Sequence, residues 1–191
     1  AKETLNIMQK LYESHKVLTY PRTDSRFLSS DIVATLPERL KACGVGEYRP
    51  LANKVLTKPI KANKSFVDDS KVSDHHAIIP TEEYVNFANF NDKERKIYDL
   101  VVKRFLAVLF PAHEFEQLTV QAQIGNEKFI ARGKTVLNAG WKEVYSNRFD
   151  DEESTDDVKE QLLPRLEKGQ ELKVTLLAQT SGQTKPPARF N

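Results

Sequence analysis

The chain has 191 residues, of which 39% are hydrophobic and 29% charged. This composition is sufficient for an apolar core, and it excludes neither an enzyme nor a binding module. A single cysteine, Cys43, excludes an intramolecular disulfide framework and a zinc site built on several cysteines. No apolar run approaches the roughly 20 residues that a membrane-spanning helix needs, and the opening residues do not form a signal peptide, so no membrane partner and a cytoplasmic location are expected.

The charge is unevenly distributed. Residues 1–64 contain twelve Lys and Arg against six Asp and Glu, a net charge of +6, so the remainder carries −4 of the overall +2. A positive segment of this kind suits a polyanionic partner. It is equally typical of a solvated lysine-rich face, and charge alone leaves both interpretations open.

Four segments before residue 111 have the apolar spacing of helices. The first is followed by an extended stretch, residues 17–20, because the residue before Pro21 is pushed away from helical geometry. The second is expected to break or restart at Pro37, and the last and strongest is expected to be capped by Asn91 or Asp92. The predicted helices are 4–14, 32–43, 48–58 and 92–110, with residues 61–81 mainly loop and a brief strand at their end.

The period changes after Pro111. Apolar and polar residues alternate over 114–124, and a hairpin at Gly125-Asn126 is expected to lead into a second strand. Residues 140–146 and 171–179 are predicted as further strands, separated by an acidic loop near 148–160. The predicted fold class is therefore α+β, with a helical unit over 1–111 and a β-rich unit over 112–191.

The stretch around Tyr20, "LTYPRTDSRFLS", is too polar for a core strand. A free tyrosine hydroxyl, with a pKa of about 10, is a poor nucleophile at neutral pH. It needs a nearby cation to attack a phosphodiester. Residues i and i+2 of an extended segment point to the same side, so Tyr20 and Arg22 could face one phosphate. On spacing alone, a tyrosine packed in a turn and an Arg22–Asp24 ion pair are the more common explanation of this pattern.

A second polar element, "SDHHAIIPT", places two histidines beside Asp74. Neighbouring residues of a strand face opposite ways, so His75 and His76 are not expected to share a metal ion, and the ligands that would complete such a site are missing. Each histidine could be a hydrogen-bonded structural group, or an imidazole that contacts phosphate and handles protons near neutral pH.

Together, "LTYPRTDSRFLS" at 18–29 and "DHHAIIPT" at 74–81 resemble motifs of the type IA DNA topoisomerases, and are most similar to the bacterial topoisomerase III branch. "FIARGKTVLNAGWKEVY" at 129–145 and "TKPPARF" at 184–190 follow in the family's order. The resemblance implies that Tyr20 is the nucleophile, that Arg22 holds the scissile phosphate, and that His75 assists there. It also implies DNA contacts from Arg22, Thr23, Ser25 and Arg26.

The fold implied by the resemblance is a winged-helix-like (CAP-like) domain that carries the tyrosine, followed by part of the family's β-rich arch, or gate, domain. The family's magnesium is bound by acids of a Toprim domain, whose Asp-x-Asp element this sequence lacks. The chain is therefore expected to be an internal piece of a topoisomerase, with no metal site of its own and little or no cleavage activity alone. The expected partner is single-stranded DNA, with no small-molecule substrate, and the expected state is a monomer.

Three other interpretations are weighed against this one. A non-catalytic winged-helix DNA-binding module would use the basic first part of the chain without forming an adduct. A DHH-type phosphoesterase is suggested by Asp74-His75-His76, but its further aspartate motifs are absent. A tyrosine recombinase needs an Arg-His-x-x-Arg element before its tyrosine, and this chain has no room for one before Tyr20.

Overall fold

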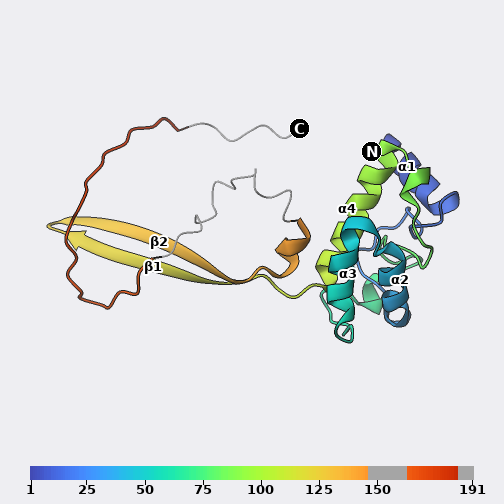
Figure 1. Ribbon diagram of the computed structural model, residues 1–191, viewed down its shortest axis with the longest axis horizontal. Helices are drawn as coiled ribbons and strands as arrows, with labels where there is room; N and C mark the ends of the chain where they lie inside the picture. The colour runs from blue at the N-terminus through green and yellow to red at the C-terminus, as the bar shows by residue number, and fades with distance from the viewer. Residues whose placement is uncertain (146–162, 185–191) are drawn as a thin grey trace.

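The computed structural model describes residues 1–145 and 163–184, and these residues form an α+β structure (Figure 1). A helical body contains the first 110 residues, and a long two-stranded ribbon extends away from it. Four α-helices are described in the body: α1 (Lys2–Glu13), α2 (Leu36–Cys43), α3 (Arg49–Leu56) and α4 (Asp92–Leu109). Five short 3₁₀ helices accompany them, η1 (Ser30–Thr35), η2 (Gly46–Tyr48), η3 (Asp69–Lys71), η4 (Phe87–Asn89) and η5 (Gly140–Tyr145).

The predicted helices are confirmed, and proline sets two of their starts. The expected break at Pro37 is a change of helix type, because η1 ends at Thr35 and α2 begins at Leu36 with the proline in its first turn. Proline is tolerated there, since the amide that it lacks would have no partner in the helix. Pro50 occupies the same position in α3. Within the described residues, no helix is long and apolar enough to cross a membrane.

Asn91, one of the two expected caps, is the N-cap residue of α4. Its side chain accepts a hydrogen bond from the Glu94 amide, and the Glu94 carboxylate accepts one from the Asn91 amide, which is a complete capping box. Glu94 is 1% exposed and also pairs with Lys10 of α1 at 2.6 Å. The cap of α4 thus holds α1 against it.

This buried carboxylate makes the stability of the fold depend on pH. Burial alone would raise the pKa of Glu94, but the hydrogen bonds from Lys10 and from the Asn91 amide, with the charge of Lys10, hold the pKa below its usual range. A carboxyl whose pKa is lowered by folding stabilises the protein above its unfolded pKa, about 4.3, and loses this effect as pH falls through the folded pKa.

We therefore expect the Glu94→Gln variant to lose less stability than the wild type when the pH is lowered from about 5 to 3. At neutral pH it should be less stable than the wild type by about 1 kcal/mol, because the cap and the Lys10 pair are weakened. Urea unfolding followed by circular dichroism at several pH values measures both effects. Identical acid sensitivity in the two proteins would contradict the assignment.

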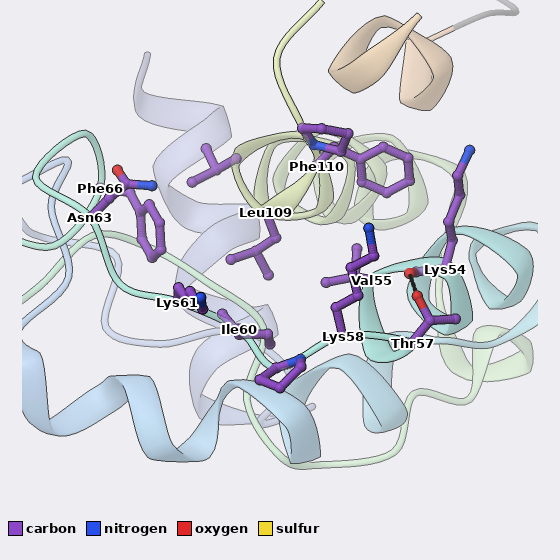
Figure 2. A pocket seen from close by; sticks show the side chains of 13 residues that line it. Lys54, Val55, Thr57, Lys58, Ile60, Lys61, Asn63, Phe66, Leu109 and Phe110 are labelled. Atoms are coloured by element: carbon purple, nitrogen blue, oxygen red, sulfur yellow. Dashed lines mark hydrogen bonds between the residues drawn. The ribbon is translucent and has the colours of Figure 1, made fainter. Parts of the chain in front are cut away.

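The apolar core lies between the helices and the segments that connect them. Leu11 of α1, Leu40 of α2 and Leu106 of α4 are fully buried, and Val144 of η5 joins the same cluster. Where α3 ends beside the end of α4, a cavity of about 390 Å³ remains, bordered by residues 57–63 (Figure 2).

The ribbon consists of β1 (Glu114–Ile124) and β2 (Glu127–Asn138), which pair antiparallel through a turn at Gly125-Asn126, as predicted. Gly125 has φ +59°, the left-handed conformation that tight hairpin turns require. Both faces of the ribbon are largely exposed, and its exposed apolar side chains include Phe115, Leu118, Phe129 and Ile130.

Two of the predicted strands are wrong. Residues 140–145 form η5, because Gly140 turns the chain sharply at φ +55° against Ala112, whose carbonyl oxygen a Cβ would approach to 2.2 Å. Val144 is thereby packed into the helical core rather than onto a sheet. Residues 171–179 form no strand, since they pair with no strand among the described residues, and Leu176 is 82% exposed.

Other expectations are not tested by these elements. The winged-helix-like detail and the division into 1–111 and 112–191 remain predictions. The acidic loop near 148–160 lies outside the described residues, as do residues 185–190 of "TKPPARF".

Candidate active site

The two polar motifs found in the sequence lie side by side. Leu18 and Pro80 form an antiparallel bridge, and the Thr19 amide donates a hydrogen bond of 3.0 Å to the Ile79 carbonyl. The extended stretch before Tyr20 is therefore half of a short ladder whose other half is the "HHAIIPT" segment. This pairing was not evident from the periodicity of either segment.

Threonine side chains fix the two motifs against each other. Thr19 Oγ1 accepts a hydrogen bond of 3.0 Å from the Ile79 amide and donates one of 3.4 Å to the Ala77 carbonyl. Thr23 Oγ1 donates one of 2.8 Å to the His75 carbonyl. The backbone on both sides of Tyr20 is thus tied to the backbone that carries His75.

Tyr20 and His75 are neighbours in space. Their ring centroids are 4.3 Å apart with the planes tilted by 40°, and the ring of Tyr12 from α1 packs edge-on against Tyr20 at 5.4 Å. Tyr20 is half-buried and His75 is exposed, so the pair lies at the surface. A hollow of about 560 Å³ adjoins Tyr20 and is also lined by Lys16 and Arg39.

Arg22 is exposed and has no ion pair among the described residues. The Arg22–Asp24 pair that would explain the motif as a structural turn is not formed within that part of the chain. A guanidinium without a carboxylate partner, two residues from the tyrosine, is available to an anion from solution.

Of the other residues expected to contact DNA, two form hydrogen bonds within the protein and one is exposed. Ser25 Oγ donates a hydrogen bond of 2.8 Å to the Lys71 carbonyl and accepts one of 3.1 Å from the Phe27 amide, so it shapes the loop, as Thr23 does. Arg26 is exposed and lines a cavity against α4. Contacts of Thr23, Ser25 and Arg26 with DNA stay predictions.

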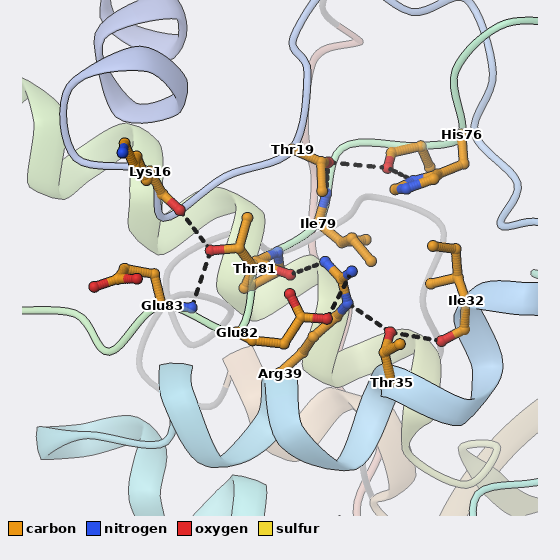
Figure 3. Close-up of polar contacts among 12 residues, drawn as sticks. Lys16, Thr19, Ile32, Thr35, Arg39, His76, Ile79, Thr81, Glu82 and Glu83 are labelled. Carbon is orange, nitrogen blue, oxygen red and sulfur yellow. Dashed lines mark hydrogen bonds and ion pairs between the residues drawn. The ribbon is translucent and has the colours of Figure 1, made fainter.

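Sequence reasoning missed Arg39, a buried arginine of α2. Its guanidinium donates to the Pro80 carbonyl at 3.0 Å and to Thr35 Oγ1 at 2.8 Å, and it pairs with Glu82 at 2.9 Å (Figure 3). Burial lowers the pKa of Arg39, and the charge of Glu82 opposes that shift. Arg39 therefore holds the Pro80 side of the ladder in place. An arginine in a helical stretch gives no sequence signal for this role.

We expect Arg39→Ala to reduce the free energy of unfolding by about 1.5–3 kcal/mol, because it leaves the buried Pro80 carbonyl without its charged donor. Loss of the pair with Glu82 should add little, since that side chain is 46% exposed. Urea unfolding measures the change. Lys41→Ala, an exposed change on the same helix, is the control and should stay within about 0.5 kcal/mol. Equal losses of stability in the two variants would contradict the proposed role of Arg39 in holding the Pro80 segment.

The described residues do not fit a metal site. Within 1–145 and 163–184, no group of three or more His, Cys, Asp and Glu side chains is placed to hold an ion. His76 Nδ1 lies 2.7 Å from the Ala77 carbonyl, and the His75 ring lies against Tyr20. The two histidines are thus engaged in different contacts, and no chemical step is derived through a metal ion.

Comparison with known proteins covers the whole chain. The family described as DNA topoisomerase matches residues 1–191. DNA topoisomerase 3 of Bacillus thuringiensis (strain Al Hakam) is 83% identical over 191 residues, which are 100% of this chain and 26% of the relative. DNA topoisomerase 3 of Bacillus subtilis (strain 168) is 58% identical over the same span, again 26% of its length. The chain thus spans about a quarter of the curated relatives it matches.

Proposed function

The chain belongs to the type IA DNA topoisomerases, in the topoisomerase III branch, and from this we propose that it supplies the nucleophile that breaks and rejoins one DNA strand. Tyr20 would attack a phosphodiester and become joined to the 5′ phosphate. A second strand would pass through the gap before the break is rejoined. This activity is proposed for a full-length protein that contains the chain.

The observation that carries the proposal is the position of Tyr20. Its ring lies 4.3 Å from that of His75, between two motifs tied together by hydrogen bonds, at a half-buried surface position. A tyrosine that served only as packing would need no exposed imidazole beside it. Nor would it need, two residues away, an arginine that forms no ion pair with the residues that the structure describes.

The chemistry balances without an external energy source. The Tyr20 oxygen forms a bond to phosphorus as the bond from phosphorus to the 3′ oxygen breaks. The phenol gives up one proton and the leaving 3′ oxygen takes one up. One phosphodiester is exchanged for another, so the reverse attack by the 3′ hydroxyl restores the strand and no ATP is required.

Arg22 and His75 would stabilise the charge that develops on the phosphate. The Arg22 guanidinium can hold two phosphate oxygens in a fork, which is worth most where charge accumulates in the transition state. His75, beside Tyr20, would donate a hydrogen bond to the same phosphate or transfer a proton there. The residues proposed for this reaction are therefore Tyr20, Arg22 and His75.

Other features are proposed for the full-length protein on the strength of the family. Magnesium would be held by Toprim acids outside this chain, and would neutralise phosphate charge when bound. The protein would act on single-stranded DNA as a monomer, in the cytoplasm and associated with the nucleoid. The chain alone would bind DNA weakly. It would cleave DNA poorly or not at all, because it lacks those acids.

The test is covalent capture with a full-length protein that contains this chain. The protein is incubated with magnesium and a single-stranded oligonucleotide labelled at its 3′ end, then denatured. Label that stays on the protein is expected, because the fragment 3′ to the break remains joined through its 5′ phosphate.

The second candidate, a non-catalytic winged-helix DNA-binding module, is favoured by the positive charge of residues 1–64. It predicts salt-dependent binding of the same oligonucleotide with no label retained after denaturation. That result, in a protein whose fold is intact, would replace the catalytic proposal.

A further inference from the structure

Beyond Tyr20, two adjoining cavities form a groove along α4. The first, of about 440 Å³, lies between residues 23–28 and α4 and is lined by Arg26 and Arg104. The second, of about 390 Å³, is the one beside the ends of α3 and α4 and is lined by Lys58 and Lys61 (Figure 2). Both are lined by Phe66, Val108 and Leu109, so they adjoin each other. We call them together the Arg26–Lys58 groove.

The charge of this groove is one-sided. Its lining contains five basic residues and, among the residues that the structure describes, no acidic one, although the chain has 27 Asp and Glu against 29 Lys and Arg. Lys54 pairs with Glu143 of η5 and lies over the Phe110 ring. The other four, Arg26, Lys58, Lys61 and Arg104, are exposed and form no ion pair in the described ranges.

The floor of the groove is apolar and partly aromatic. Phe66 and Phe105 are buried beneath it, 5% and 4% exposed, and Phe27 is half-buried at its first cavity. Lys71 Nζ lies over the Phe27 ring at 4.4 Å. Cations beside an apolar floor suit a single-stranded nucleic acid, with phosphates on the cations and bases against the apolar surface. Four cations spread over three segments suit a chain of phosphates better than one small anion.

The position of the groove favours DNA over an acidic peptide. Its first cavity is lined by Thr23, Ser25 and Arg26, which belong to the tyrosine motif and directly follow Arg22. A strand held at Tyr20 and Arg22 would therefore enter the groove next. An acidic peptide has no corresponding reason to begin at this motif.

We propose that the Arg26–Lys58 groove binds the single-stranded DNA that flanks the break, with phosphates on Arg26, Arg104, Lys61 and Lys58. This assignment rests on the proposed function, and it places a DNA-binding surface on residues 54–66 and on α4, outside the tyrosine and histidine motifs. It assigns to Arg104, Lys58 and Lys61 a role that the sequence motifs do not indicate.

The test is the salt dependence of binding. A full-length protein that contains this chain is titrated with a fluorescent single-stranded oligonucleotide of about 16 nucleotides, and the anisotropy is followed at several salt concentrations. Lys58→Ala with Lys61→Ala should weaken binding and lower the slope of log K against log[salt] by about 1.4, which is about 0.7 for each lost phosphate contact. Arg104→Ala should lower it by about 0.7.

The matched control replaces two other exposed lysines, Lys2→Ala with Lys96→Ala, which removes the same charge away from the groove. This control should keep the wild-type slope, and thermal melting checks that all variants fold. An equal loss of slope in both double variants would overturn the groove, because it would reflect net charge alone. Tighter binding of a poly-glutamate peptide than of the oligonucleotide, through Lys58 and Lys61, would also overturn it.

A second readout locates the bases. Oligonucleotides with one photoreactive 4-thiothymidine at successive positions should cross-link to peptides that contain Phe27 or Phe66, and cross-links confined to other segments would contradict the proposal. Binding to the groove does not require the nucleophile, so Tyr20→Phe should bind with the wild-type slope. Failure of covalent capture would therefore count against the proposed function only. The groove proposal is tested separately by the salt dependence of oligonucleotide binding.

Discussion

Tyr20→Phe in a full-length protein that contains this chain is expected to abolish the covalent protein–DNA adduct completely. The change removes one oxygen atom, which is the atom proposed to attack phosphorus, and leaves the aromatic ring that packs against Tyr12 and His75. Covalent capture with a 3′-labelled oligonucleotide, followed by denaturing electrophoresis, measures the result. Binding of the oligonucleotide should persist, since the proposed phosphate contacts come from other residues.

Tyr12→Phe is the matched control for this prediction. Tyr12 contacts Tyr20 edge-on and lines the same hollow, so its hydroxyl tests whether any tyrosine at this surface will serve. The Tyr12 variant should form the adduct at close to the wild-type level. An adduct that survives in the Tyr20 variant would remove Tyr20 from the mechanism, whatever the binding data show.

Arg22→Ala is expected to slow cleavage by on the order of a hundredfold or more, the loss typical of removing one preorganised donor from a developing oxyanion. The fold should be unaffected, because Arg22 is exposed and forms no ion pair within the described residues. Single-turnover cleavage of a labelled oligonucleotide at saturating protein separates this effect from weaker binding.

Two further variants sharpen the result for Arg22. Arg22→Lys keeps the charge but loses the fork, and should recover part of the rate. Arg49→Ala removes an exposed arginine at the start of α3, and should leave the rate unchanged. A cleavage rate for Arg22→Ala within twofold or so of the wild type would leave only a binding role for this residue.

The helical body could be predicted from the sequence because its signals are local. The apolar stripe of α4 and the Asn91 cap lie within a few residues of one another, and the prolines that begin α2 and α3 act on their own turns. The hairpin was predictable for the same reason, since Gly125 provides the left-handed turn between two alternating segments.

The two wrong strands show where local signals stop. Residues 140–145 alternate well enough for a strand, but Gly140 and the burial of Val144 against the helices make them a 3₁₀ helix. Residues 171–179 have the β-prone composition of a strand, yet a strand is stable only when another one pairs with it. In the first segment the outcome was set by neighbours far away in the sequence, and in the second by the lack of a pairing strand among the described residues.

For the candidate site, the sequence by itself determined the chemical groups: a tyrosine two residues before an arginine, and a histidine in a second motif. The roles proposed for these residues come from the resemblance of the two motifs to a known family. Only the tertiary structure decided that the ring centroids of Tyr20 and His75 lie 4.3 Å apart and that Arg39 bonds to the Pro80 carbonyl. It also decided that four basic side chains without an ion pair among the described residues border one groove. The physical reason is that residue identity carries local chemistry, whereas proximity depends on backbone pairing and core packing between segments distant in the chain.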